Sequence, residues 1–148
     1  MSLHAIQDYL HQHIPLSAAM EVAVLAADDQ QVLLSAPLAP NINHRSTVFG
    51  GSASAVATLA AWTYLHLRLR EAKVDGQLVI QRNTMNYQQP IYGEFTARAT
   101  LVQPEKWDSF VRLLQRRGRA RIRVETELEY NGEKAGHFTG EFVALANE

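Results

Sequence analysis

The residues most able to do chemistry lie in one stretch, where a polar loop leads through two glycines into an apolar segment. Small side chains dominate that segment, which favours a buried helix. The first amides of this helix, those of Gly51, Ser52 and Ala53, are expected to lack intrahelical partners. Such amides, at the positive end of the helix dipole, can bind an anion or a carbonyl oxygen that becomes anionic during a reaction. A simpler alternative is that Gly50 and Gly51 only form a tight turn, with Ser52 as an ordinary helix cap.

A general base is harder to find near this helix start. No Asp or Glu occurs between Asp29 and Glu71, and Glu71 lies about 30 Å along the helix from Gly51. His44 in the loop is the nearest candidate, because histidine side chains titrate in the range that suits proton transfer. The alternatives are that His44 is a solvated loop residue, and that Glu21 or a second subunit supplies the base.

Two further groups of polar residues are candidates for contacting a ligand. Gln81, Arg82 and Asn83 interrupt a strand that begins apolar, and one alternative is that they form a solvent-exposed face near a sheet end. Six arginines fall between residues 112 and 123, and the three at alternating positions from 119 to 123 are expected on the solvent face of a strand. Arg116 and Arg117 precede that strand and are suited to binding an anionic group. The run lacks the interleaved aromatic residues of a nucleic-acid site.

Length and composition limit the class of protein. The 148 residues fit a single domain, 1–148, and a hydrophobic content of 47% with 20% charged residues is ordinary for a soluble globular protein. A formal charge of −1 argues against a general nucleic-acid binder. There are no cysteines, and the histidines near the N-terminus do not share one helix face, so no metal or cofactor is expected. The N-terminus lacks a signal-peptide pattern and the apolar helix is too short for a bilayer, which predicts a cytoplasmic protein without a membrane partner.

The pattern of apolar residues predicts an α+β chain. A short amphipathic helix is expected at the N-terminus and ends at Pro15. One long helix of about 30 Å is expected to begin at Gly50 and Gly51. Asn131 and Gly132 form a strong hairpin signal. Strands are expected at 20–27, 31–36, 77–89, 94–102, 119–130 and 134–145, with a loop or short helix at 104–117. Together these elements predict an antiparallel meander around one long buried central helix, with one face of the sheet exposed to solvent.

Several short motifs occur in an order that resembles a known family. They are Ala39-Pro40-Asn41-Ile42-Asn43, Thr47-Val48-Phe49-Gly50-Gly51-Ser52, Trp62, Tyr87-x-x-Pro90, Arg117-Gly118-Arg119-Ala120 and Phe138-Thr139-Gly140-x-Phe142-Val143. Together they cover nearly the whole chain and resemble the putative thioesterase family known as the YiiD C-terminal domain. The resemblance implies the hot-dog fold, in which an antiparallel sheet wraps around a central helix.

The resemblance also implies roles for single residues. In the broader hot-dog thioesterases an Asn lies six residues before His-Gly-Gly, and a carboxylate lies nine residues after that His. On this chain the Asn falls on Asn43 and the glycines on Gly50 and Gly51, whereas Phe49 stands at the His position and Thr58 at the carboxylate. The candidate catalytic residues are Asn43, Gly51 and Thr58, which the resemblance implies, together with His44 from the loop. In hot-dog proteins the strand at 77–89 commonly pairs with its copy across a dimer, so the resemblance implies that Gln81, Arg82 and Asn83 line a site shared between subunits. The candidate substrate-binding residues are Thr47, Phe49, Gly50, Ser52, Gln81, Arg82, Asn83, Arg116 and Arg117.

The activity implied by the resemblance is hydrolysis of an acyl thioester carried by coenzyme A or an acyl-carrier protein, in a homodimer or higher homo-oligomer without a cofactor. A non-catalytic module that binds such thioesters is the alternative, and the missing His and carboxylate favour it. A dehydratase of 3-hydroxyacyl thioesters is a weaker alternative, because that chemistry relies on a His with an acidic residue.

Overall fold

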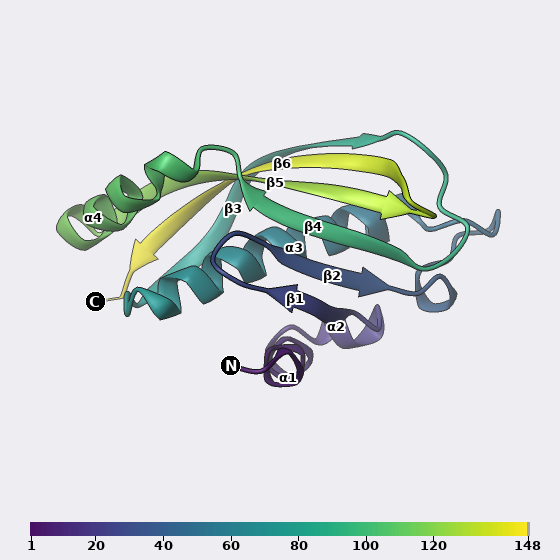
Figure 1. Ribbon diagram of the computed structural model, residues 1–148, viewed down its shortest axis with the longest axis horizontal. Coiled ribbons are helices and arrows are strands. Elements are labelled where there is room, and N and C mark those ends of the chain that lie inside the picture. The colour runs from purple at the N-terminus through teal and green to yellow at the C-terminus, as the bar shows by residue number, and fades with distance from the viewer. Residues whose placement is uncertain (148) are drawn as a thin grey trace.

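The computed structural model describes residues 1–147, in which a six-stranded antiparallel sheet curves around one long helix, α3 (Figure 1). The helices are α1 (Leu3–His13), α2 (Pro15–Ala19), α3 (Gly50–Glu71) and α4 (Trp107–Arg117). The strands are β1 (Ala23–Ala27), β2 (Val32–Ala36), β3 (Gly76–Tyr87), β4 (Phe95–Leu101), β5 (Arg119–Tyr130) and β6 (Glu133–Ala146). The predicted architecture, a sheet around a central helix with a short helix in front, is confirmed.

Helix α3 can lie close to the sheet because its buried residues are small. Ala57, Ala60 and Ala61 are fully buried, and such residues form helix readily while allowing close backbone approach. The hydroxyl of Thr126 on β5 donates a hydrogen bond to the carbonyl oxygen of Ala57 over 3.0 Å. Sheet and helix are therefore in direct polar contact at the centre of the core.

The order of the strands differs from the predicted meander. The sheet runs β1-β2-β4-β5-β6-β3, so β3 pairs with the last strand of the chain and forms an edge. The reason is α3, which enters after β2 and spans the length of the sheet before β3 begins (Figure 1). Apart from this displaced strand, consecutive strands are neighbours.

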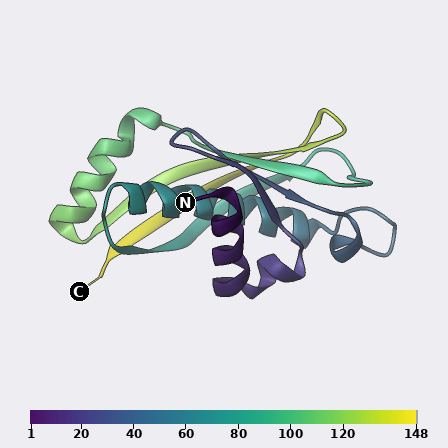
Figure 2. The same cartoon turned by 60° about the horizontal axis from the view of Figure 1, so that its bottom comes forward.

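The N-terminal segment also differs in detail from the prediction. Pro15 does not simply stop the first helix but begins the second one, α2, where its missing N–H is not needed. The strand expected from residue 20 starts only at Ala23. Figure 2 shows α1 lying across α3 on the side away from the sheet. The segment 104–117, expected to be a loop or a short helix, is a 3₁₀ turn followed by α4.

No helix within residues 1–147 is both long and apolar enough to cross a membrane. No group of three or more His, Asp or Glu side chains within the same residues is placed to hold a metal ion.

We expect Phe138→Ala to be strongly destabilising. The Phe138 side chain on β6 is fully buried, and its ring lies so close to Gly140 that an added Cβ there would be 2.8 Å from the ring. Removing a packed ring should lower the free energy of unfolding by about 3–5 kcal/mol. Urea denaturation measures this, with Thr139→Ala as the control on the opposite face. Equal effects of both substitutions would contradict the packing described above.

Candidate active site

The start of α3 presents backbone amides without partners. Phe49 is the cap residue and no side chain caps the helix. Among residues 1–147, nothing accepts a hydrogen bond from the amides of Gly50, Gly51 or Ser52. The amide of Ala53 differs from the prediction, because it donates to the carbonyl oxygen of Phe49 over 3.0 Å. The three free N–H groups lie where the helix dipole favours negative charge.

Two aromatic rings flank these amides. A Cβ added to Gly51 would lie 2.5 Å from the Phe49 ring, and one added to Gly50 would lie 3.5 Å from the Tyr87 ring. Both rings are themselves exposed, with Phe49 at 57% and Tyr87 at 59%. Glycine at position 51 therefore leaves room for a ring directly over the first helical turn.

An apolar hollow, here called the helix-start cavity, opens beside Gly50. Its volume is about 330 Å³, which is enough for a small organic group. The start of α3, the end of β3 and the β5–β6 hairpin all contribute to its walls. Its lining includes Val48, Gly50, Ala53, Tyr87, Ile91, Leu128 and Ala135.

The side chain of Asn43 shapes the loop before α3. Its Nδ2 donates to the hydroxyl of Thr47 over 2.8 Å, and its Oδ1 accepts from the amides of Arg45 at 2.8 Å and Thr47 at 3.2 Å. Asn43 and Thr47 are therefore largely occupied with each other and with the loop backbone. In this state Asn43 acts as a turn residue.

A neighbouring asparagine, Asn41, was not among the predicted site residues but anchors the same loop. Asn41 is 1% exposed, and its Nδ2 donates to the carbonyl oxygens of Met20 at 3.0 Å and Pro37 at 2.8 Å. Its own carbonyl oxygen accepts from the amide of Phe49 over 2.7 Å. Asn41 thereby ties the cap residue of α3 to the turn before β1. The burial that marks this role is not visible in the sequence.

The other two predicted catalytic side chains, His44 and Thr58, form no hydrogen bond with the amides of Gly50, Gly51 or Ser52 within residues 1–147. His44 is exposed and its Nε2 is 3.4 Å from the Nε of Arg45. The Thr58 hydroxyl donates to the carbonyl oxygen of Ser54 over 2.8 Å. Thr58 lines a second hollow of about 400 Å³, here called the α3–β3 groove, that Gly50 does not line. The groove is lined by Ile14, Leu16, Met20, Ser54, Ala55, Thr58, Leu59, Trp62, Leu78, Ile80 and Phe142.

Comparison with known proteins decides the family. The family model described as "Putative thioesterase (yiiD_Cterm)" matches residues 3–146. The chain belongs to this family. The resemblance found in the sequence is thus confirmed.

Solved structures agree with this assignment to the yiiD_Cterm family. A putative thioesterase from Shewanella oneidensis is 30% identical, with a TM-score of 0.86 over 97% of this chain and 96% of that one. A protein of unknown function from Chlorobaculum tepidum is 27% identical, with a TM-score of 0.91 over 97% and 94%. A probable thioesterase from Pseudomonas aeruginosa, 17% identical with a TM-score of 0.85 over 99% and 97%, has the same fold. The hot-dog fold is confirmed.

In this yiiD_Cterm family chain, the three consecutive polar residues 81–83 of β3 do not share one face of the sheet. Arg82 pairs with Glu141 in the ladder, and its Nη1 lies 3.8 Å from the Oε2 of that residue on the outer face. Asn83 pairs with Gly140, in phase with the buried residues of β6, so it faces α3. Gln81 lies at the bulge between them. Arg82 therefore does not line the α3–β3 groove.

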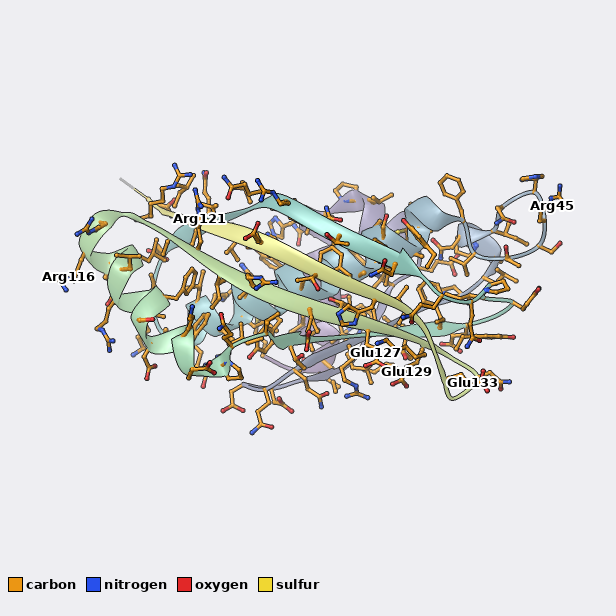
Figure 3. All side chains as sticks on the ribbon, turned by 90° about the horizontal axis from the view of Figure 1, so that it is seen from above. Arg45, Arg116, Arg121, Glu127, Glu129 and Glu133 are labelled. Atoms are coloured by element: carbon orange, nitrogen blue, oxygen red, sulfur yellow. The ribbon has the colours of Figure 1, made fainter. Side chains whose placement is uncertain are left out.

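The two candidate anion-binding arginines lie far from the free amides of the same chain. Arg116 and Arg117 are the last residues of α4. Figure 3 shows Arg116 at one end of the molecule and Arg45, from the loop before α3, at the other. Helix α3 alone is about 33 Å long. Within one chain of this family member, Arg116 and Arg117 cannot contact a group bound at Gly51.

A stack of three rings joins α1 to α3, and one of them, Trp62, lines the α3–β3 groove. The His66 ring lies 4.7 Å from that of Trp62 and 5.1 Å from that of Tyr9, both in stacked geometry. His66 Nε2 is buried and has no hydrogen-bond partner within residues 1–147. Burial lowers the pKa of His66, and the nearby Arg70 and His13 lower it further.

We expect His66→Phe to reduce the acid sensitivity of this yiiD_Cterm protein. Because the folded chain holds the pKa of His66 below its unfolded value near 6.5, the unfolded chain binds the proton more readily. The contribution of His66 to stability is therefore lost as the pH falls below about 6.5. Urea denaturation at about pH 7.5 and about pH 5 measures this, and the variant should lose less stability than the wild type between them. An equal loss in variant and wild type would show that His66 does not cause the acid sensitivity.

Proposed function

We propose that this protein hydrolyses acyl thioesters carried by coenzyme A or an acyl-carrier protein. The observation that supports it most is the set of free amides at Gly50, Gly51 and Ser52, which open beside an apolar cavity in a thioesterase-family chain. In this proposal the acyl chain lies in the helix-start cavity and the carbonyl oxygen lies on the amides. The cytoplasmic location expected from the sequence is part of the proposal.

The amides would act on the oxygen that gains charge during hydrolysis. A water oxygen attacks the carbonyl carbon, and the electron pair of the C=O double bond moves to the carbonyl oxygen. Preorganised N–H groups stabilise this oxyanion, and removing one such donor typically costs about 10²–10³ in rate. The electron pair on the oxyanion then re-forms the C=O bond, the C–S bond breaks, and the sulfur leaves as a thiolate. The proton lost by water passes to that sulfur, so the products are a carboxylic acid and a thiol. His44, on the loop before α3, is our proposed carrier of that proton.

We also propose that the working unit is a homodimer formed through β3. This strand has 12 residues, pairs on one side only with β6, and exposes Val79 and Ile80. A long exposed edge strand is a template for pairing with another chain. A two-fold axis at its midpoint would extend the sheet with an antiparallel β3–β3 pair, next to the α3–β3 groove.

A panel of acyl-CoA and acyl-carrier-protein thioesters, with release of the thiol as the readout, tests the activity. We expect turnover for at least one acyl chain, with saturation. A correctly folded protein that releases no thiol from any member of the panel would contradict the proposal.

The second candidate is a module that binds acyl thioesters without cleaving them. It is favoured by the lack of an acidic residue from position 30 to position 70 and by the use of Asn43 within its own loop. Calorimetry with the same acyl-CoA panel separates the two functions. Tight binding without thiol release would establish the binding module.

A further inference from the structure

The basic end of the molecule adjoins one end of β3. The Cβ position of Gly76, the first residue of β3, is 3.8 Å from the Leu114 side chain of α4 and 3.1 Å from the carbonyl oxygen of Leu145. Leu145 pairs with Arg119 at the start of β5. Residues 116, 117 and 119, all arginines, thus cluster beside the Gly76 end of β3.

The free amides adjoin the opposite end of the same strand. Tyr87, the last residue of β3, has its ring 3.5 Å from the Cβ position of Gly50. In the ladder Tyr87 is level with Gly136 on β6 and Leu128 on β5. Arg119 lies nine residues from Leu128, about 30 Å along β5. In one chain the arginines and the amides are therefore too far apart to hold one small ligand.

A two-fold axis at the middle of β3 brings these two ends together. Antiparallel pairing places Gly76 of one copy beside Tyr87 of the other. With strands about 4.8 Å apart, Arg119 of the partner subunit would lie about 14 Å from Tyr87, three strand spacings away. Figure 3 agrees, because Arg116 and Arg45 lie at opposite ends of the molecule, and a half-turn about an axis perpendicular to β3 exchanges the two ends.

The arginines at this end are available for a ligand. Arg116, Arg117 and Arg119 are exposed, and none of them forms an ion pair within residues 1–147. Guanidinium groups match phosphate oxygens in charge and geometry. Arg45, on the loop before α3, would add a further positive charge on the side of the amides.

We propose that Arg116, Arg117 and Arg119 bind in trans the phosphates of a coenzyme A thioester, whose acyl carbonyl lies on α3 of the other copy. This inference rests on the proposed function and names its carrier. The pantetheine arm of coenzyme A separates the thioester from the nucleotide phosphates and can span a gap of about 14 Å between the β3 end and the arginines. A substrate without the nucleotide would gain nothing from these arginines.

The first test compares acyl-CoA with acyl-pantetheine, which carries the same thioester without the nucleotide. The Arg116→Ala/Arg117→Ala variant should raise KM for acyl-CoA about tenfold or more and leave acyl-pantetheine unchanged. The affinity for desulfo-CoA, measured by calorimetry, should fall by a similar factor. Arg112→Ala, on the same helix, is the matched control and should change neither value. If the variant and the wild type have the same KM for acyl-CoA and the same affinity for desulfo-CoA, the inference is overturned. If the wild type binds desulfo-CoA but cleaves no thioester, only the proposed function is overturned.

The second test asks whether the arginines act across the dimer. Phe49→Ala/Gly51→Pro removes the amide and Arg116→Ala/Arg117→Ala removes the charges, so each variant alone should be impaired on acyl-CoA. If the arginines act in trans, a mixed dimer of the two variants contains one intact site. Mixing should then restore acyl-CoA turnover well above either variant. A mixture no more active than its two components would show that the arginines do not act in trans.

Discussion

Replacing Gly51 with proline should lower kcat/KM for thioester cleavage by about 10²–10³ while the protein remains folded. Proline has no N–H, and its backbone geometry suits the first turn of a helix. Gly51 is the second residue of α3 and its amide has no partner within residues 1–147. The substitution therefore removes one proposed oxyanion donor without removing a helical hydrogen bond. Thiol-release kinetics measure the effect, and circular dichroism checks the fold.

The control must separate the lost amide from crowding by the Phe49 ring. A side chain at position 51 would overlap that ring, so Gly51→Pro is best measured against Phe49→Ala as the parent. Ser52→Ala keeps every amide of the first turn and should lower kcat/KM far less than Gly51→Pro does. If Phe49→Ala/Gly51→Pro is as active as Phe49→Ala, the amide of Gly51 is not an oxyanion donor.

Placing lysine at both Val79 and Thr84 should convert the protein to a monomer. Val79 is three residues from the start of β3 and Thr84 is three from its end, so a central two-fold axis would place them opposite each other. Like charges directly opposite in a β ladder are destabilising, and lysine on an edge strand opposes pairing. Both side chains lie on the face away from α3, because they pair with Val143 and Thr139 of β6. Sedimentation velocity at micromolar concentration measures the change.

A charge-swapped variant provides the matched control. Val79→Lys/Thr84→Glu places opposite charges across the same interface and should remain a dimer. Acyl-CoA turnover should fall with the dimer in the double-lysine variant and persist in the swapped variant. A double-lysine variant that remains as dimeric as the wild type would show that β3 is not the interface.

The fold could be predicted from the sequence where local patterns decide it. The alternation over β5 placed Ala120, Ile122 and Val124 inside, and all three are buried. Asn131 and Gly132 both have positive φ, as the predicted hairpin turn requires. The neighbours of β3 could not be predicted, because alternation tells which face of a strand is buried and not which strand lies beside it.

The site was predicted less completely, because its geometry depends on side-chain contacts within the loop. The prediction that the first amides of the helix have no hydrogen-bond partner is correct for Gly51 and Ser52. It is wrong for Ala53, whose amide donates to the carbonyl oxygen of Phe49. Spacing alone distinguished Asn43 from Asn41 in the sequence, and it did not show that Asn41 is buried or that Asn43 is half-buried and bonded within its own turn. The catalytic roles assigned to Asn43, His44 and Thr58 stay predictions.

A crystal structure with a ketone analogue of acyl-CoA, in which a methylene group replaces the thioester sulfur, would show where the reacting carbonyl binds. We expect its oxygen within about 2.7–3.1 Å of the Gly51 nitrogen and the acyl chain in the helix-start cavity. An analogue bound with its carbonyl oxygen away from the amides of Gly50, Gly51 and Ser52 would contradict this binding mode.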